Sequence, residues 1–406
     1  MNIQNRSLLK HIAVKILVII FTITLIAPEA LAEIKLLYRE KNCGLFTEQS
    51  LWYDQPCPLD IYADGTTVYI LMYSDGEPFI VLDVSDPHNI KKIGEYHKEK
   101  DAVWQAMPDS VKGSGIWQVH DMDMGDFESR RLAFIKTTES LQVLDCTDPG
   151  NIFSLGCRPG CAIPPGSGSA MVEVKSPYVF ISFGSGCRIF KYSALAASEG
   201  KAPYEFVADV NPGYSSQYSF DFELSRDKQC LYVAGFFGLD AYTIANINKP
   251  AHIFRYENIN FPYQAGNKGI SVKADKNLLF LGTSRDLRIF DISNPAIPKP
   301  LKDDNNKDTL YPTLGPVLDI ALYGKYVFLF YGPIEDEKPA KPQDIGLEIV
   351  DISDPRLPEF IDAFILGPAT RFRYNPKQKM ALVPEAGLAI LGSDTFYILD
   401  VSDYIK

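Results

Sequence analysis

The densest group of chemically useful side chains lies in the segment WQAMPDSVKGSGIWQVHDMDMGDF at residues 104–127. In it, two indole rings stand close in sequence to an imidazole and to several carboxylates. Aromatic faces beside carboxylates are suited to binding a sugar, a peptide or a cationic group. The alternative is that both tryptophans only fill a gap between packed sheets. As candidate binding residues the segment offers Trp104, Trp117, His120, Asp121 and Asp123.

Acidic residues also recur at comparable positions in short apolar stretches that we expect to be the innermost strands of the fold. If these strands surround a channel, their carboxylates converge there, and a hard cation such as Ca²⁺ prefers oxygen ligands. The alternative, which is favoured, is that each Asp accepts backbone N–H groups from a neighbouring sheet. No other cofactor is indicated. The expected channel-lining acids are Asp60, Asp121 (or Asp123), Asp221 (or Glu223) and Asp319, while the other strands offer Met171, Ser271 and Met380.

Sequence patterns of established catalytic sites are missing. Neither GSGSA nor GSGCR is a Gly-x-Ser-x-Gly elbow, and the chain has no Walker sequence, dinucleotide fingerprint or His-Glu-x-x-His. His88 and His252 occupy matching turn positions of a repeat and are interpreted as structural. Two acids at a suitable separation can cleave a glycoside. A hydrolase or lyase that uses Asp121 and Asp319 on a glycan or other envelope polymer is therefore the alternative to a non-catalytic protein.

A repeated phrase indicates which elements position these residues. FIVLDVSDPHNIKKIGEY at 79–96 returns as LEIVDISDPRLPEFIDAF at 347–364, and related copies begin at Leu141, Leu287 and Phe396. Two degenerate copies, CRIFKYSAL and LDAYTIANINKPAHIFRY, complete the series. The average interval is about 53 residues, which is close to the length of a kelch-type propeller blade.

Each unit contains the pattern of four short antiparallel strands. In the fifth unit we predict strands at 270–274, 278–282, 287–292 and near 298–302. The third strand is apolar at nearly every position, as expected where both faces are covered. The Asp-x-Ser-Asp-Pro stretch after it is typical of a turn. Seven such units predict an all-β fold, a seven-bladed β-propeller of four-stranded antiparallel blades.

The copies FIVLDVSDP, LQVLDCTDP, LRIFDISNP and LEIVDISDP resemble the LVIVD-repeat family of bacterial exported β-propeller proteins. The resemblance covers most of residues 58–406. The third and fourth units depart from it, because Lys191 and Thr243 replace the Asp of the turn. What the resemblance implies is a fold, and it brings no established catalytic residues.

The chain divides into residues 1–32, a predicted signal peptide, and residues 33–406, a single propeller domain. The basic start, the apolar run ILVIIFTITLIA and the small residues Ala30 and Ala32 predict cleavage after Ala32. A retained membrane anchor is the alternative, but the apolar run is short for a bilayer. We therefore expect a bacterial protein in the periplasm, at the cell surface or secreted, without a transmembrane segment after cleavage.

Charge and cysteine content narrow the partners and the covalent chemistry. The net charge is −11, and the chain has no Lys/Arg cluster, which argues against nucleic acid. Disulfides are the expected state of cysteines in an exported chain. Cys43 and Cys57 are the pair that we predict first, within the N-terminal segment 33–57. Cys146 and Cys157 could also pair, with Cys161 competing for either.

The two ends of the chain are expected to meet. The last copy of the phrase ends at Lys406, just after its third-strand motif, so a fourth strand is missing there. We predict that residues 34–39 pair with this last blade and close the ring, which removes an exposed edge. In an alternative register, residues 371–375 supply the missing strand.

Long connections concentrate on one predicted face of the propeller. They are 97–116, 157–169, 301–316 and 331–346. Variable loops on a rigid scaffold commonly carry binding sites. The alternative is that these loops are neutral surface insertions, and the third unit is an exception, because its long connection SALAASEGKAP lies on the other face. The sequence therefore predicts an exported, non-catalytic propeller that binds a protein, peptide or glycan partner of the cell envelope through this face.

Overall fold

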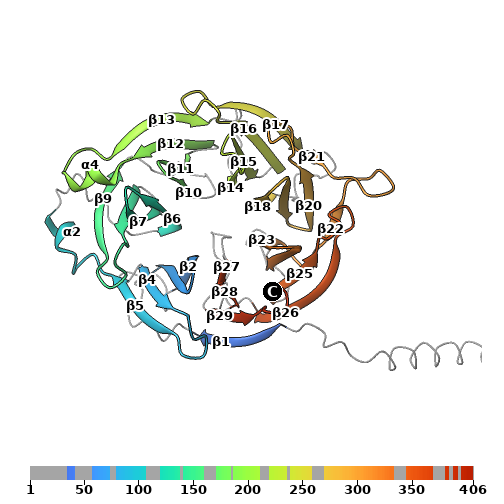
Figure 1. Ribbon diagram of the computed structural model, residues 1–406, viewed down its shortest axis with the longest axis horizontal. Coiled ribbons are helices and arrows are strands. Elements are labelled where there is room, and N and C mark those ends of the chain that lie inside the picture. Colours follow the sequence, from blue (N-terminus) through green and yellow to red (C-terminus); the bar gives the residue numbers. More distant parts are fainter. Residues whose placement is uncertain are drawn as a thin grey trace, which may run out of the picture. The chain divides into compact units, whose positions relative to one another are not determined.

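Short runs of β-branched and aromatic residues form the strands, and turns rich in Gly, Asn, Asp and Pro separate them. The computed structural model assembles them into seven antiparallel sheets around a common centre (Figure 1). Six sheets have four strands, and the remaining sheet has five. An all-β propeller with four-stranded antiparallel blades is thereby confirmed. The residues that the structure describes are 34–41, 57–73, 79–106, 119–137, 140–159, 171–183, 186–210, 219–235, 238–257, 269–332, 344–368, 380–383, 387–391 and 395–405.

In the first four sheets the strands follow one another in chain order, from the innermost strand to the outermost. The first sheet contains β2 (Cys57–Asp64), β3 (Thr67–Tyr73), β4 (Phe79–Asp83) and β5 (Lys91–Tyr96). The second contains β6 (Val119–Phe127), β7 (Arg130–Thr137), β8 (Ser140–Asp145) and β9 (Phe153–Pro159). The third contains β10 (Val172–Lys175), β11 (Tyr178–Phe183), β12 (Gly186–Tyr192) and β13 (Tyr204–Val210). The fourth contains β14 (Ser219–Leu224), β15 (Cys230–Gly235), β16 (Gly238–Thr243) and β17 (Ala251–Glu257).

The fifth sheet differs at its outer edge, and the sixth repeats the common pattern. The fifth contains β18 (Gly269–Asp275), β19 (Leu278–Thr283), β20 (Asp286–Asp291), β21 (Lys299–Pro300) and β22 (Leu310–Pro312). Both β21 and β22 pair with β20, so two short pieces take the place of the predicted strand near 298–302. The sixth contains β23 (Val317–Tyr323), β24 (Tyr326–Tyr331), β25 (Asp344–Asp351) and β26 (Glu359–Pro368).

The seventh sheet combines strands from both ends of the described chain. It contains β27 (Met380–Val383), β28 (Gly387–Leu391), β29 (Thr395–Asp400) and β1 (Lys35–Lys41). Strand β1 pairs antiparallel with β29, with Lys35 opposite Asp400 and Lys41 opposite Thr395. The predicted pairing of residues 34–39 with the last blade is therefore present. The alternative strand at 371–375 lies outside the described residues, as does the predicted signal peptide.

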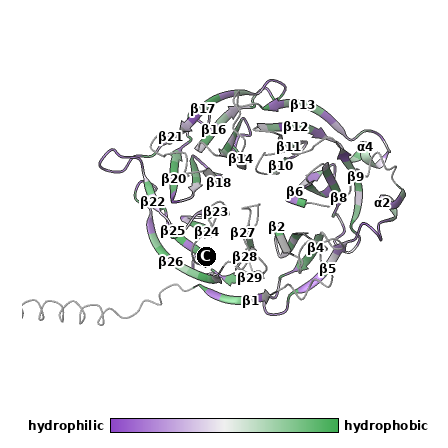
Figure 2. Cartoon of the chain, turned by 180° about the vertical axis from the view of Figure 1, so that it is seen from behind, coloured by the Kyte–Doolittle hydropathy of each residue, from purple (hydrophilic) through white to green (hydrophobic). Residues whose placement is uncertain are grey.

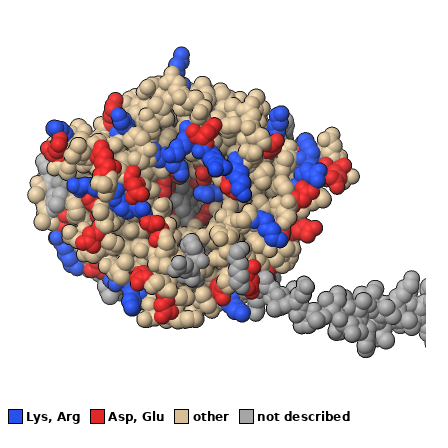
Figure 3. Space-filling view, viewed as in Figure 1, with Lys and Arg blue, Asp and Glu red and all other residues tan. Residues whose placement is uncertain are grey.

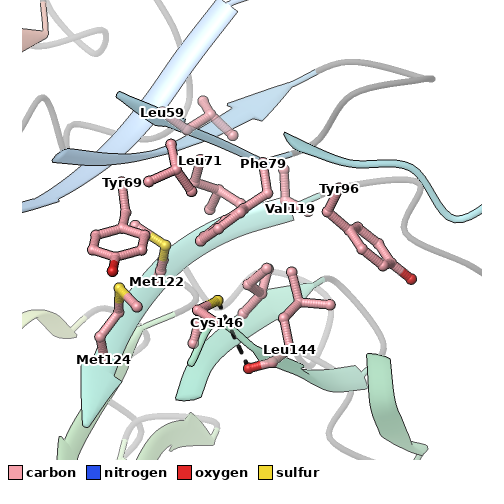
Figure 4. Packing of buried hydrophobic residues seen from close by; sticks show 13 residues of the cluster. Leu59, Tyr69, Leu71, Phe79, Tyr96, Val119, Met122, Met124, Leu144 and Cys146 are labelled. Carbon is pink, nitrogen blue, oxygen red and sulfur yellow. Dashed lines mark hydrogen bonds between the residues drawn. The ribbon is translucent and has the colours of Figure 1, made fainter. Parts of the chain in front are cut away.

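The hydrophobic core lies between successive sheets. Ile70 and Ile80 of the first sheet pack in one cluster with Phe396 and Ile398 of β29. A second cluster joins the first sheet to the second through Leu71, Phe79, Met122 and others (Figure 4). The second and third strands are deeply buried, and all residues of β8 are inaccessible to solvent or nearly so. Hydrophilic residues dominate the peripheral turns (Figure 2). The apolar surface that stabilises the fold is therefore buried between the sheets.

The acids of the repeated phrase build turns, as predicted. The Asp351 carboxylate accepts a 2.7 Å hydrogen bond from the Ser353 N–H, and the same bond recurs at Asp83, Asp145, Asp291 and Asp400. In the degenerate fourth unit the Thr243 hydroxyl accepts from the Ala245 N–H at 3.4 Å. The third unit instead places Ser193 at the N-cap of helix α4 (Ala194–Ser198). The turn is thus made in different ways where the Asp is replaced.

Candidate site in the central channel

The aspartates predicted to line the channel connect neighbouring blades. Asp60 of β2 is fully buried, and its carboxylate accepts hydrogen bonds from its own strand at Ile61 N (2.7 Å) and from β6 at Met122 N (2.6 Å). Bonds to the next blade recur along the inner strands: Asp121 accepts from Val172 N (2.7 Å), Asp123 from Val174 N (2.6 Å), Asp221 from Val272 N (2.9 Å) and Asp319 from Met380 N (2.6 Å). The structural interpretation of these acids is therefore confirmed.

A shift in strand register precedes four of these five aspartates, Asp123 being the exception. Pairing between the first two strands slips by one residue just before Asp60, Asp121, Asp221 and Asp319. The same shift precedes Ser271, whose hydroxyl donates to the Val317 carbonyl of the next blade at 3.2 Å. A bulge re-aims the side chain that follows it. The bulge and the polar side chain thus form one repeated device for joining blades.

One expected channel position needs correction, and the expected calcium site stays open. Met380 supplies the N–H that Asp319 binds, so it corresponds to Met122 and Val172 and lies one position beyond the channel acids. Among the described residues, no three His, Cys, Asp or Glu side chains are placed to hold a metal ion. The calcium site stays an untested prediction.

A cavity of about 410 Å³ lies at the centre of the ring and is lined by all seven innermost strands. Acidic and basic side chains surround the hollow at the centre of the face in Figure 3. On each innermost strand, the residue two places after the channel position in the sequence lines the cavity. These residues lie at the same depth in the channel. In blade order they are Tyr62, Asp123, Glu173, Glu223, Lys273, Ala321 and Ala381. Charged residues therefore occupy one side of the cavity, and small or aromatic residues occupy the other.

The charged wall consists of Asp123, Glu173, Lys175, Glu223 and Lys273. The Lys273 ammonium lies 3.0 Å from the Glu223 carboxylate on the adjacent blade, and Lys175 lies 3.2 Å from Glu173. Burial raises the pKa of Glu223, although Lys273 opposes that shift. The Glu223 carboxylate in turn raises the pKa of Lys273. Glu223 is only 10% exposed, so its charge lies where hydrogen bonds and nearby charges act strongly, whereas the Lys273 side chain is open to the cavity.

Sequence reasoning considered Glu223 and missed the rest of this ion-pair group. The signal that could have found Glu173 and Lys273 is the strand period of two, because residues two apart point to the same face of a strand. Each follows a predicted channel position, Met171 or Ser271, by two residues. Their partners across the blades depend on the ring and not on sequence spacing.

The candidate binding segment at 104–127 does not form one site in the described residues. Trp104 lies on helix α2 (Ala102–Ala106), is 6% exposed, and belongs to an element that packs on the outer strand β9. Asp121 and Asp123 lie on the innermost strand β6. In Figure 1, α2 is outside the ring of sheets. Trp104 therefore does not join the channel acids, and Trp117 lies outside the described residues.

The predicted structural histidines behave differently from one another. His88 is exposed in a turn, where its N–H donates to Asp86 at 3.0 Å. His252 lies on β17, not in the matching turn, and its Nε2 is 3.0 Å from the Asp240 carboxylate. His120 is half-buried at the bulge of β6, where burial lowers its pKa to about 4.

Four cysteines lie in the described part of the chain, all four are buried, and no disulfide joins any two of them. They are Cys146, Cys157, Cys187 and Cys230. The considered pair of Cys146 and Cys157 is therefore not formed, because Cys157 lies opposite Gln142 in the sheet and Cys146 follows the end of that strand. The predicted bond between Cys43 and Cys57 involves side chains outside the described residues, as does any bond of Cys161.

Comparison with protein families supports the resemblance seen in the repeated phrase. The LVIVD repeat model matches residues 269–301 and 342–364. These segments are LVIVD repeats. They cover β18–β21 of the fifth blade, and β25 with much of β26 in the sixth. The copies in the first two blades share the pattern but lie outside the matched ranges. No curated protein matches this chain.

Solved structures resemble the chain at low sequence identity. A periplasmic gluconolactonase from Pseudomonas aeruginosa is 12% identical with a TM-score of 0.51, over 76% of this chain and 85% of that chain. A functionally unknown protein from Desulfotomaculum acetoxidans is 14% identical with a TM-score of 0.47, over 85% of this chain and 91% of that chain. At such identities the similarity concerns the fold alone. In the described part of the chain, no helix is long and apolar enough to span a membrane.

Proposed function

We propose that this LVIVD-repeat propeller is an exported, non-catalytic binding protein. Its partner would be a protein, peptide or glycan of the cell envelope. The observation that carries this proposal is the use of the channel aspartates as acceptors of backbone N–H groups. A carboxylate that accepts such bonds is stabilised in its ionised form and is a poor proton donor. A hydrolase built on Asp121 and Asp319 would need one of them as its acid.

The partner-binding face is proposed from the direction of the strands. Every innermost strand begins on the face where the second strand ends and the third begins. In the sixth blade, β24 ends at Tyr331 and β25 begins at Asp344 on that face. Connections on this face are the longest in the sequence, whereas the opposite face carries mostly short hairpins such as Asp64–Thr67. A rigid ring with longer loops at one end suits recognition without chemistry.

The test is a binding experiment with the mature chain. The chain from residue 33 onward is immobilised and exposed to an envelope extract, and the retained protein or glycan is then titrated in purified form. Replacing residues 334–343 with a Gly/Ser linker should weaken binding at least tenfold. Glu199→Gln with Lys201→Met is the control, because this exposed ion pair lies on the opposite face. Time-dependent conversion of an envelope polymer, abolished by Asp121→Asn or Asp319→Asn, would overturn the proposal.

One observation keeps a hydrolase or lyase as the second candidate. Glu223 lines the cavity, and its raised pKa favours retention of a proton. Groups with such shifts in a cavity are candidates for acid catalysis. In this reading Glu223→Gln would abolish product formation, whereas Asp→Asn changes at the blade junctions would only lower stability.

We also infer that the seven sheets are the blades of one closed ring, with β1 as its closing strand. The pairing of β1 with β29, and the contact of β2 with β27, support this inference. Export to the periplasm, the cell surface or the medium is part of the same proposal. It is supported by the leader-like sequence of residues 1–32.

A further inference from the structure

The two walls of the central cavity differ in chemistry. On one wall, two ion pairs lie on adjacent blades: Glu173 with Lys175 on β10, and Glu223 with Lys273 between β14 and β18. The other wall, from β23, β27 and β2, presents Ala321, Leu322, Ala381, Leu382 and Tyr62, together with Asp319, whose carboxylate accepts the backbone N–H groups of Ile320 and Met380. The cavity therefore offers charges of both signs on one side and mostly apolar surface on the other.

The ion pairs have capacity for further hydrogen bonds. An ammonium group has three N–H donors and a carboxylate has about four acceptor positions, so one contact leaves most of them available. Lys273 is 47% exposed even though the innermost strands surround it, because its side chain lines the cavity. Glu223 is only 10% exposed, and burial raises its pKa, so its charge is incompletely stabilised by the protein. A ligand that brings a positive group to Glu223 would supply that stabilisation.

The pairing of the wall charges restricts the charge of the ligand. A ligand with a single charge would contact only one partner of an ion pair and weaken the attraction of that partner to the other. A zwitterion instead supplies an ammonium for Glu223 or Glu173 and a carboxylate for Lys273 or Lys175. The small side chains of Ala321 and Ala381 leave room opposite for an apolar group. The volume of about 410 Å³ is within the range of small-molecule sites.

We propose that the channel binds a free α-amino acid with a large apolar side chain. Its ammonium and carboxylate groups contact the ion-paired wall, and its side chain lies against the alanine and leucine wall. This site goes beyond the proposed partner-binding face and does not require the long loops. If the envelope extract yielded no partner, this proposal would still stand. If no amino acid bound in the channel, the proposed partner-binding face would still stand.

Calorimetric titration of the mature chain tests the proposal with three related probes. L-Phenylalanine should bind, whereas phenylethylamine lacks the carboxylate, 3-phenylpropanoate lacks the ammonium, and each should bind at least tenfold more weakly. If phenylethylamine bound as tightly as L-phenylalanine, the site would be a cation site and the proposal would be wrong. Lack of binding by L-phenylalanine, L-leucine and L-methionine at roughly 10 mM would also overturn it.

Variants locate the binding in the channel. Glu223→Gln with Lys273→Met should weaken L-phenylalanine binding at least tenfold, and Glu199→Gln with Lys201→Met should leave it unchanged, because that pair is exposed on the surface. Since the Glu223–Lys273 pair joins two blades and also contributes to folding, Ala381→Phe provides a second variant that fills the apolar side without touching a charge. Unchanged affinity in a folded Ala381→Phe protein would place the ligand elsewhere and contradict the proposal.

Discussion

At the scale of single residues, the same residue type serves distinct purposes in different places. Asp83 and Asp351 accept N–H groups two residues ahead and shape turns. The bond from Ser85 lowers the pKa of the Asp83 carboxyl. Burial opposes the shift at Asp351, but hydrogen bonds from Lys325 and Ser353 lower the pKa of that carboxyl. Asp60 and Asp121 accept N–H groups from another blade. Glu223 lies in the cavity beside a lysine, and its pKa is raised by burial. Surroundings, and not residue type, therefore decide which acids are available for binding.

His120 provides a pH-dependent prediction at this scale. Burial, with Lys136 adding to the effect, lowers its pKa from 6.5 to about 4. Between these values the unfolded chain holds a proton that the folded chain lacks, so the free energy of unfolding should fall as pH falls through this window. The loss between pH 7 and pH 5 should be about 1–2 kcal/mol smaller in His120→Gln than in the wild type. Urea unfolding at both pH values measures it.

The control for His120 is His88→Gln, because His88 is exposed in a turn. This variant should keep the pH dependence of the wild type. Equal pH dependence in the wild type and in His120→Gln would show that His120 is not the group responsible.

At the scale of elements, the innermost strands combine two functions. Alternate residues along β6, β14 and β23 point into the packing between blades or toward the channel, as the strand period requires. The bulge near the start of each strand lets one carboxylate reach the next blade. Residues further along the same strand then line the cavity. The hydrogen bonds that join the blades thus also fix the positions of the wall side chains.

Asp319 tests this role of the inner strands. Its two carboxylate oxygens accept from Ile320 N at 2.7 Å and from Met380 N at 2.6 Å. In Asp319→Asn one oxygen becomes an NH₂ donor that faces an N–H, so the free energy of unfolding should fall by about 1–3 kcal/mol. Chemical denaturation measures this loss. Asp275→Asn is the matched control, because Asp275 is exposed at the end of the neighbouring strand β18.

One result would contradict this account of Asp319, and another would extend it. Unchanged stability of Asp319→Asn would show that the bond to Met380 contributes little. Thermal stabilisation of the wild type by calcium, lost in Asp319→Ala, would assign an ion to the channel acids as well.

At the scale of the whole molecule, each sheet buries its faces against the next. The cluster that contains Phe396 and Ile398 of β29 also contains Ile70 and Ile80 of the first blade. The outer strand of that last sheet is β1, so the sheet depends on residues from both ends of the described chain. Cooperative stability of the ring should therefore depend on β1.

Deletion of residues 33–40 from the mature chain tests the closing role of β1. The shortened protein should melt at a lower temperature, and its free energy of unfolding should fall by roughly several kcal/mol, because the pairing of β1 with β29 is removed. Added peptide EIKLLYREK should raise the melting temperature in a concentration-dependent manner, since it binds only the folded ring. A scrambled peptide of the same composition is the control. An unchanged melting temperature of the shortened protein would contradict closure by β1.

Much of the fold could be predicted because each blade needs the same local features. The apolar third strand and the turn after it recur at Asp83, Asp145, Asp291 and Asp351 with nearly the same residues. The site was harder to predict. Trp104 and Asp121 are close in sequence, yet one lies on a peripheral helix and the other on an innermost strand. Sequence proximity does not report on radial position within a blade.

The sequence by itself determined the strands, their order within a blade, the turns between them and the use of repeated blades. These follow from local residue preferences and from hydrophobic periodicity, which need no knowledge of distant contacts. Only the tertiary structure decided that Asp319 binds the backbone at Met380 and that Glu223 lies beside Lys273. These contacts join residues on different blades. The distance between them depends on how the sheets pack around the channel, and no local pattern of residues encodes that packing.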